Sequence, residues 1–133
     1  MNGYLSSYGG KMVTIEAQTF NMGCTDGMSS CSSNEFPVHS VTLTSNFYVA
    51  ETEVTQEQYL DVMGTNPSFF DSCGPDCPVE NMTWHQAAYF ANAVSTAEAL
   101  TECYTCTGTA LDAYCEEEVG PYDCGGYRLP TEA

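Results

Sequence analysis

The amino-acid sequence predicts a disulfide-rich α+β fold, and three observations support this prediction. Short stretches rich in β-branched residues indicate strands, because branched side chains pack well on a pleated surface. Two Thr-x-x-Gln patterns indicate helices, because these residues form capping boxes at helix N-termini. The eight cysteines indicate crosslinks between loops. The length of 133 residues fits one domain or less, and an apolar fraction of 43% is enough for a folded core.

The first half of the sequence contains the predicted strands. Residues Met12–Phe20 are rich in β-branched side chains and are predicted to form the first strand. Residues Val41–Thr44 alternate apolar residues with threonine, which is typical of a half-buried strand, and Phe47–Ala50 is predicted as a third strand. The segment Cys24–Asn34, rich in Ser, Gly and Asp, is predicted to be a surface loop between the first two strands.

The first helix is predicted after these strands, from about Gln56 to Met63. Thr55 and Gln58 match a capping box, in which each side chain accepts a hydrogen bond from the backbone of the other residue. Tyr59 lies on the face of this helix that is expected to be buried.

A second helix is predicted after Thr83, which forms another capping box with Gln86. Residues at helical spacing make one apolar face of this helix, and we expect that face to pack against the sheet or the first helix. The residues of this face are Trp84, Ala87, Ala88, Ala91 and Val94. Ser95 with Glu98 repeats the capping-box pattern, so we expect the helix to restart or bend there.

The eight cysteines form four close-spaced pairs in polar segments, which is typical of disulfides in an oxidising compartment. Residues 103–126 form a long insert without a helical or strand period, and two internal crosslinks would stabilise such a loop. Proximity in the sequence favours the pairs Cys24–Cys31 and Cys73–Cys77, and a nested arrangement of Cys103–Cys124 around Cys106–Cys115.

Two other uses of the cysteines are less favoured. A zinc site could combine Cys73 and Cys77 with Cys103 and Cys106, but the other four thiols would then lack partners. The Cys-x-x-Cys spacing of Cys103 and Cys106 could indicate redox activity, but acidic neighbours should raise the thiol pKa, and the strand-to-helix context is absent.

The sequence is strongly acidic, with 18 Asp and Glu residues against two Lys and Arg residues and a net charge of −16. This charge excludes binding to nucleic acid, which requires a basic surface. A run of apolar residues long enough to span a membrane is not found. Calcium or a cationic ligand could use such a surface, but no twelve-residue calcium loop is recognised, so a solvated acidic surface is the simpler interpretation.

Arg128 is the single arginine of this acidic chain. We expect it to make a structural, charge-assisted hydrogen bond to a carboxylate, with Glu53 and Glu132 as candidate partners. His39 and His85 lie outside any metal-binding or catalytic pattern, so surface or hydrogen-bonding roles are expected for both.

The last residues of the sequence, Arg128–Ala133, read Arg-Leu-Pro-Thr-Glu-Ala. Proline followed by a capping threonine predicts that a helix begins here, so the sequence is expected to stop within an element. This run resembles the central signature of the formylglycine-generating enzyme, or sulfatase-modifying factor, family. The segments Glu53–Thr55, Asn66–Ser68 and Met82–Trp84 resemble the same family in the same order.

The resemblance covers residues 12–133, with residues 1–11 as a tail, and corresponds to the N-terminal half or so of such a domain. It implies a C-type-lectin-like α+β fold of the sulfatase-modifying factor type, incomplete in this sequence. Family oxidases convert a cysteine of a sulfatase to formylglycine with oxygen and copper. The thiol pair that binds copper lies near the C-terminal end of the family domain, and no cysteine here matches it.

The resemblance therefore assigns no catalytic, cofactor-binding or metal-binding residue to this sequence, and copper or calcium is expected only in a complete family domain. A protein or peptide substrate would be bound through that complete domain. The alternatives are a non-catalytic extracellular lectin-like binding module and a purely structural, disulfide-crosslinked surface protein. The cysteine-rich insert resembles secreted bacterial family members, so an extracellular or periplasmic location is expected.

The crosslinks can be tested by mass spectrometry. A thiol-alkylating reagent should leave the untreated protein unmodified, and it should add eight labels after reduction and unfolding, because all eight cysteines are expected in disulfides. Labelling of eight thiols without reduction would contradict the disulfide framework.

Overall fold

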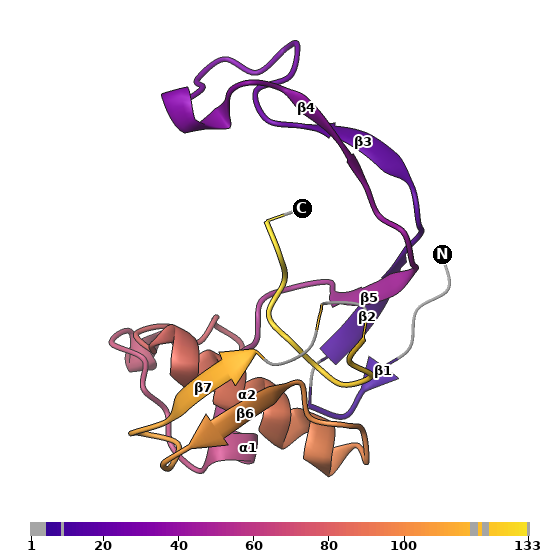
Figure 1. Ribbon diagram of the computed structural model, residues 1–133. Coiled ribbons are helices and arrows are strands. Elements are labelled where there is room, and N and C mark those ends of the chain that lie inside the picture. The colour runs from indigo at the N-terminus through magenta and orange to yellow at the C-terminus, as the bar shows by residue number, and fades with distance from the viewer. Residues whose placement is uncertain (1–4, 9, 118–119, 121–122, 133) are drawn as a thin grey trace.

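The computed structural model describes residues 5–8, 10–117, 120 and 123–132, and shows an α+β body from which one hairpin projects (Figure 1). Glu118 and Ala133 lie outside the described residues. The strands are β1 Leu5–Ser6, β2 Gly10–Ile15, β3 Thr19–Met22, β4 His39–Thr42, β5 Phe47–Ala50, β6 Tyr104–Thr107 and β7 Tyr114–Glu117. The α-helices are α1 Gln56–Met63 and α2 Trp84–Ala97, and short 3-10 helices occupy Ser33–Glu35 and Asp71–Cys73. The predicted α+β class is confirmed.

The strand predicted over Met12–Phe20 is two strands, β2 and β3. β2 pairs with β1 and β5 in an antiparallel sheet, whereas β3 pairs only with β4 among the described residues. The break lies at residues 16–18, where the backbone nitrogen of Ala17 donates to Asn46 Oδ1 over 2.7 Å. The single β-branched run concealed this break, because a sequence pattern does not show that the two halves have different partners. Within the predicted tail, Leu5–Ser6 forms β1.

The hairpin of β3 and β4 extends away from the helices, and its loop is closed by the Cys24–Cys31 disulfide (Figure 1). Gly23 has a φ of +111°, and a Cβ atom at this position would lie 2.6 Å from the carbonyl oxygen of Glu35. Glycine is therefore required where the loop begins, because it tolerates this φ and leaves room for the neighbouring backbone.

Helix α1 has the predicted bounds, and both ends are capped. Thr55 Oγ1 accepts a hydrogen bond from the Gln58 backbone nitrogen over 3.2 Å, and Gln58 Oε1 accepts one from the Thr55 nitrogen over 2.8 Å. Gly64 ends the helix with a φ of +72°. Tyr59 is buried and stacks on Phe90 with 5.1 Å between ring centroids, and burial raises the pKa of the Tyr59 hydroxyl.

Helix α2 begins at the predicted Thr83 cap but does not restart at Ser95. Ser95 is fully buried inside the helix, and its hydroxyl donates to the carbonyl oxygen of Ala91 over 2.8 Å. The capping-box prediction for Ser95 and Glu98 is wrong, because the serine is satisfied within the helix rather than at an N-terminus. Among the described residues, no helix combines the length and the hydropathy needed to cross a bilayer.

The buried face of α2 contains Ala88, Ala91 and Val94, as predicted, whereas Ala87 is only partly buried and Trp84 is exposed. Trp84 is 49% exposed and packs edge-on against Tyr104, with 5.5 Å between ring centroids. The alanines let β6 and β7 approach the helix closely, whereas the indole lies at the first helical residue, where the core ends.

The insert at residues 103–126 contains an antiparallel hairpin of β6 and β7, which the sequence analysis did not predict. Each strand has four residues, too few for a period to be visible in the sequence. Cys106 lies directly opposite Cys115, and the two are joined by a disulfide. The other disulfides are Cys24–Cys31, Cys73–Cys77 and Cys103–Cys124, the same pairs that proximity favours, so the zinc and redox uses of these thiols do not apply.

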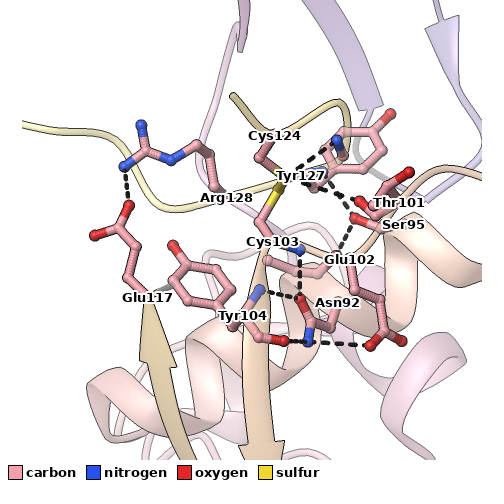
Figure 2. The surroundings of a disulfide bond; sticks show 12 residues. Asn92, Ser95, Thr101, Glu102, Cys103, Tyr104, Glu117, Cys124, Tyr127 and Arg128 are labelled. Carbon is pink, nitrogen blue, oxygen red and sulfur yellow. Dashed lines mark hydrogen bonds and ion pairs between the residues drawn. A yellow bond between two sulfur atoms is a disulfide. The ribbon is translucent and has the colours of Figure 1, made fainter. Parts of the chain in front are cut away.

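The segment at residues 124–127 is fixed to α2 where it passes Ser95 (Figure 2). The Cys103–Cys124 disulfide anchors its start, and the Tyr127 backbone nitrogen donates to Ser95 Oγ over 2.7 Å. Gly126 lies between these anchors, and a Cβ atom there would overlap the carbonyl oxygen of Thr101 and lie 2.6 Å from Ser95 Oγ. A residue without a side chain is therefore needed for this close approach.

The adjacent glycines provide a matched test of this approach. Gly126→Ala should destabilise the protein by about 1–3 kcal/mol, because the added methyl group has no space. Gly125→Ala should change stability by no more than about 0.5 kcal/mol, because open space surrounds that position. Denaturant unfolding of both variants measures the difference. Equal stabilities would contradict the close packing at Gly126.

Candidate functional site

The segment at residues 124–127, which leads into the family-like motif, lies against a polar face of α2. Asn92 and Ser95 are three residues apart and so project from one side of the helix, and Glu98 is the C-cap residue that follows the helix. Asn92 is buried, and its amide oxygen accepts hydrogen bonds from the backbone nitrogens of Cys103 and Tyr104, each over 3.1 Å. Its amide nitrogen donates to the Tyr104 carbonyl over 2.7 Å. Asn92 thus fixes the start of β6 (Figure 2).

Glu98 joins both ends of the described chain to α2. Its Oε1 accepts hydrogen bonds from Ser6 Oγ over 2.6 Å and from the Ser7 backbone nitrogen over 3.0 Å. Its Oε2 accepts one from the Tyr127 hydroxyl over 2.7 Å. Partial burial by itself would raise the pKa of this carboxyl group, but the hydrogen bonds hold the pKa below its ordinary value. The carboxylate therefore stays ionised in the folded protein at neutral pH.

Arg128 makes a different ion pair from the predicted ones. Its Nη2 donates to Glu117 Oε1 over 2.9 Å (Figure 2), rather than to Glu53 or Glu132. Glu117 ends β7, and the unpredicted hairpin brings this carboxylate beside the segment that carries Arg128. The pair is partly exposed, so it contributes about 1 kcal/mol or less to stability.

The next motif residue, Leu129, is tied to β6. Its backbone nitrogen donates to the hydroxyl of Tyr104 over 2.9 Å, and its side chain packs against the core cluster that contains this tyrosine. Pro130, Thr131 and Glu132 follow and are exposed. The first residues of the motif are therefore held by side chains of β7 and β6, and its last described residues lie at the surface.

A group of partly exposed aromatic rings adjoins Tyr104 through Trp84, and we define Trp84, His85 and Tyr114 as the aromatic surface. The ring centroids of Trp84 and His85 are 5.3 Å apart, and those of His85 and Tyr114 are 4.5 Å apart. Tyr114 is 54% exposed, similar to Trp84. The first turn of α2 and the first residue of β7 position these three rings.

Both histidines make local hydrogen bonds. His85 Nδ1 lies 3.1 Å from the Cys115 backbone nitrogen, from which it accepts when the proton is on Nε2. The same atom lies 3.1 Å from the Cys115 carbonyl oxygen, to which it donates in the other tautomer. This contact aligns the imidazole with the edge of β7. His39 Nδ1 lies 3.0 Å from the Pro37 carbonyl oxygen.

Two open depressions are found among the described residues. One of about 450 Å³ lies beside α2 and β6, and its polar side chains bond to each other, as when Thr96 Oγ1 donates to Glu102 Oε1 over 2.7 Å. Another of about 410 Å³ lies at the end of the projecting hairpin, beside Cys24 and Val38. Neither depression brings together an acid, a base and a nucleophile.

The residues present do not fit the metals that the family resemblance implies. All eight cysteines are in disulfides, so they offer no thiolate to copper. Within the part of the chain that the structure describes, one metal-type cluster is found, Cys24, Cys31 and Glu35. Its two sulfurs are bonded to each other, which leaves one carboxylate, whereas calcium takes six to eight oxygen ligands.

Glu98 predicts a loss of stability in acid. Its folded pKa is lowered from 4.5, so its contribution is complete above about pH 4.5 and is lost as the pH falls through the folded pKa. Glu98→Gln should therefore lower the melting temperature most at neutral pH, and the gap to the unmodified protein should narrow toward about pH 2. Melting curves across this range measure the gap; Glu57→Gln, an exposed carboxylate on α1, is the control. A difference in melting temperature that does not change with pH would contradict the role of the ionised Glu98 carboxylate.

Comparison with known proteins shows that the sequence is similar to one protein family. Residues 6–133 match the sequence profile of the sulfatase-modifying factor enzyme 1-like domain. The chaperone protein LppX of Paenibacillus barcinonensis is 38% identical over 115 residues, which are 80% of this chain and 40% of that protein.

Two solved structures are also similar. Treponema denticola variable protein 1 matches with a TM-score of 0.61 and 31% identity, over 85% of this chain and 40% of that chain. PvdO from Pseudomonas aeruginosa matches with a TM-score of 0.62 and 20% identity, over 79% of this chain and 46% of that chain, which shows a shared fold. The chain thus spans less than half the length of each of these proteins. This structural similarity agrees with the C-type-lectin-like α+β fold that the motif resemblance implies, and the chain belongs to the sulfatase-modifying factor enzyme 1-like domain family.

Proposed function

We propose that this chain forms the N-terminal, disulfide-crosslinked part of a sulfatase-modifying-factor-type domain, with residues 12–133 as one unit, and that this part serves in binding rather than in thiol chemistry. The observation that carries the proposal is the state of the cysteines, all eight of which are joined in disulfides. A sulfur atom in a disulfide is neither a thiolate nucleophile nor a copper ligand of the thiolate type.

The other described features favour a scaffold with an accessible surface. On the polar face of α2, Ser95 accepts a hydrogen bond from the backbone of Tyr127, just before the family motif, and Asn92 accepts one from the backbone at the start of β6. Both side chains therefore already have structural roles. The aromatic surface remains accessible to a ligand. Similar proteins are named a chaperone and a variable protein, and neither name describes the oxidation of a sulfatase.

Oxidation of a sulfatase cysteine is the second candidate function, because the matching family is named for sulfatase modification. This activity would require a pair of thiols in addition to the eight cysteines of this sequence. The crosslinked residues described here would then act as the frame that positions a catalytic centre.

We also propose an extracellular or periplasmic location at a bacterial envelope. Four disulfides close loops of 4 to 21 residues, and such crosslinks persist in oxidising compartments. The similar proteins from Paenibacillus, Treponema and Pseudomonas support a bacterial setting.

An oxidation assay separates the two candidate functions. The protein is incubated with copper, oxygen and a cysteine-containing sulfatase peptide, and mass spectrometry follows the peptide thiol; a peptide with serine in place of that cysteine gives the background. We expect the peptide cysteine to be lost no faster than in a protein-free control, because this chain offers no thiolate. Catalysed conversion to formylglycine would overturn the binding proposal in favour of the oxidase.

A further inference from the structure

We propose that the aromatic surface of Trp84, His85 and Tyr114 binds the cationic side chains of a basic peptide segment. The inference rests on the proposed binding function and names the chemistry of its ligand. It follows from the geometry of the rings, from a carboxylate beside them, and from the ion pairs in which both basic side chains of the chain are already engaged.

The rings provide the apolar and electrostatic part of the site. Trp84 and Tyr114 are each about half exposed, with His85 between them, so the three rings form one continuous accessible group. The faces of tryptophan and tyrosine carry negative electrostatic potential and attract guanidinium and ammonium groups within about 6 Å. The hydrogen bond from the Cys115 backbone nitrogen to His85 Nδ1 and the contact of Trp84 with Tyr104 keep the rings in place before a ligand arrives.

A carboxylate lies beside the rings. Glu116 is two residues after Tyr114 on β7, so the two side chains project from the same face of the strand. The Tyr114 hydroxyl donates to Glu116 Oε1 over 3.4 Å, which places an exposed negative charge at the edge of the aromatic surface. A cation above the tyrosine ring could pair with this carboxylate. A neutral apolar ligand would gain nothing from it and would remove part of its hydration.

The chain does not supply this cation itself. Its two basic side chains pair elsewhere, Lys11 with Glu51 over 2.6 Å and Arg128 with Glu117 over 2.9 Å. The net charge of −16 then attracts a basic partner over a longer range, and the aromatic surface supplies the local contact. Charge complementarity therefore favours a basic peptide over an acidic or uncharged one.

The single tryptophan makes the site directly observable, because all tryptophan fluorescence of the protein comes from Trp84. The probe is a Gly-Arg-Gly-Arg-Gly peptide, and the matched peptide carries citrulline, which has nearly the shape of arginine but no charge. At physiological salt, the arginine peptide should change the Trp84 emission with a saturable curve. The citrulline peptide should bind at least about fivefold more weakly, which corresponds to about 1 kcal/mol of cation–π energy.

Two variants of equal net charge separate a local site from a general acidic attraction. Glu116→Gln should weaken binding of the arginine peptide about threefold to fivefold, because it removes the carboxylate beside Tyr114. Asp26→Asn removes one charge from the loop of the projecting hairpin and should leave the affinity unchanged. Tyr114→Leu should weaken binding as well, and circular dichroism checks that each variant is folded.

Three results would overturn the inference: no saturable change in emission, equal binding of the arginine and citrulline peptides, or equal weakening by Glu116→Gln and Asp26→Asn. The last result would assign the attraction to the overall charge. These outcomes are independent of the oxidation assay, so a failure here leaves the disulfide-based binding function standing. Catalysed oxidation of the sulfatase peptide would overturn that function without changing the fluorescence result.

Discussion

The buried polar face of α2 is the constraint on which the rest of the structure depends. Asn92 and Ser95 are almost fully buried, and each unsatisfied polar group at such a site would cost about 1–3 kcal/mol. Their partners are backbone groups of β6 and of the segment at Tyr127, and Glu98 adds contacts to Ser6 and Ser7. One helix with its C-cap therefore fixes the first strand, the insert and the residue that precedes the family motif in a single arrangement.

The disulfides support this arrangement where the hydrophobic core is small. The two core clusters contain few fully buried large side chains, and the hairpin of β6 and β7 rests on the alanines of α2. The Cys103–Cys124 disulfide joins the two ends of the insert, and Cys106–Cys115 joins β6 to β7 within it. Each disulfide also restricts the unfolded chain. The same bonds occupy the sulfur atoms, so structural stability and the absence of thiol chemistry in these residues have one cause.

The position of Trp84 connects packing with function. The small side chains of Ala88 and Ala91 bring β6 and β7 close to α2, and the indole at the first helical residue then lies beyond the edge of the core. It contacts the rings of Tyr104 and His85, and His85 in turn contacts Tyr114 on β7. An aromatic residue that periodicity would bury thus becomes part of an accessible surface.

The sequence by itself determined the features that depend on neighbouring residues. The caps at Thr55 and Thr83 and the bounds of α1 follow from contacts between residues three or four positions apart. The disulfide pairs follow from the close spacing of the cysteines, and the family motif could be recognised directly. Only the tertiary structure decided the partner of Arg128, the division of β2 from β3, the hairpin of β6 and β7 and the exposure of Trp84. These features depend on how the strands and helices pack in the folded chain. Local sequence patterns do not show such packing, as in the hydrogen bond between Ser6 and Glu98, which are 92 positions apart.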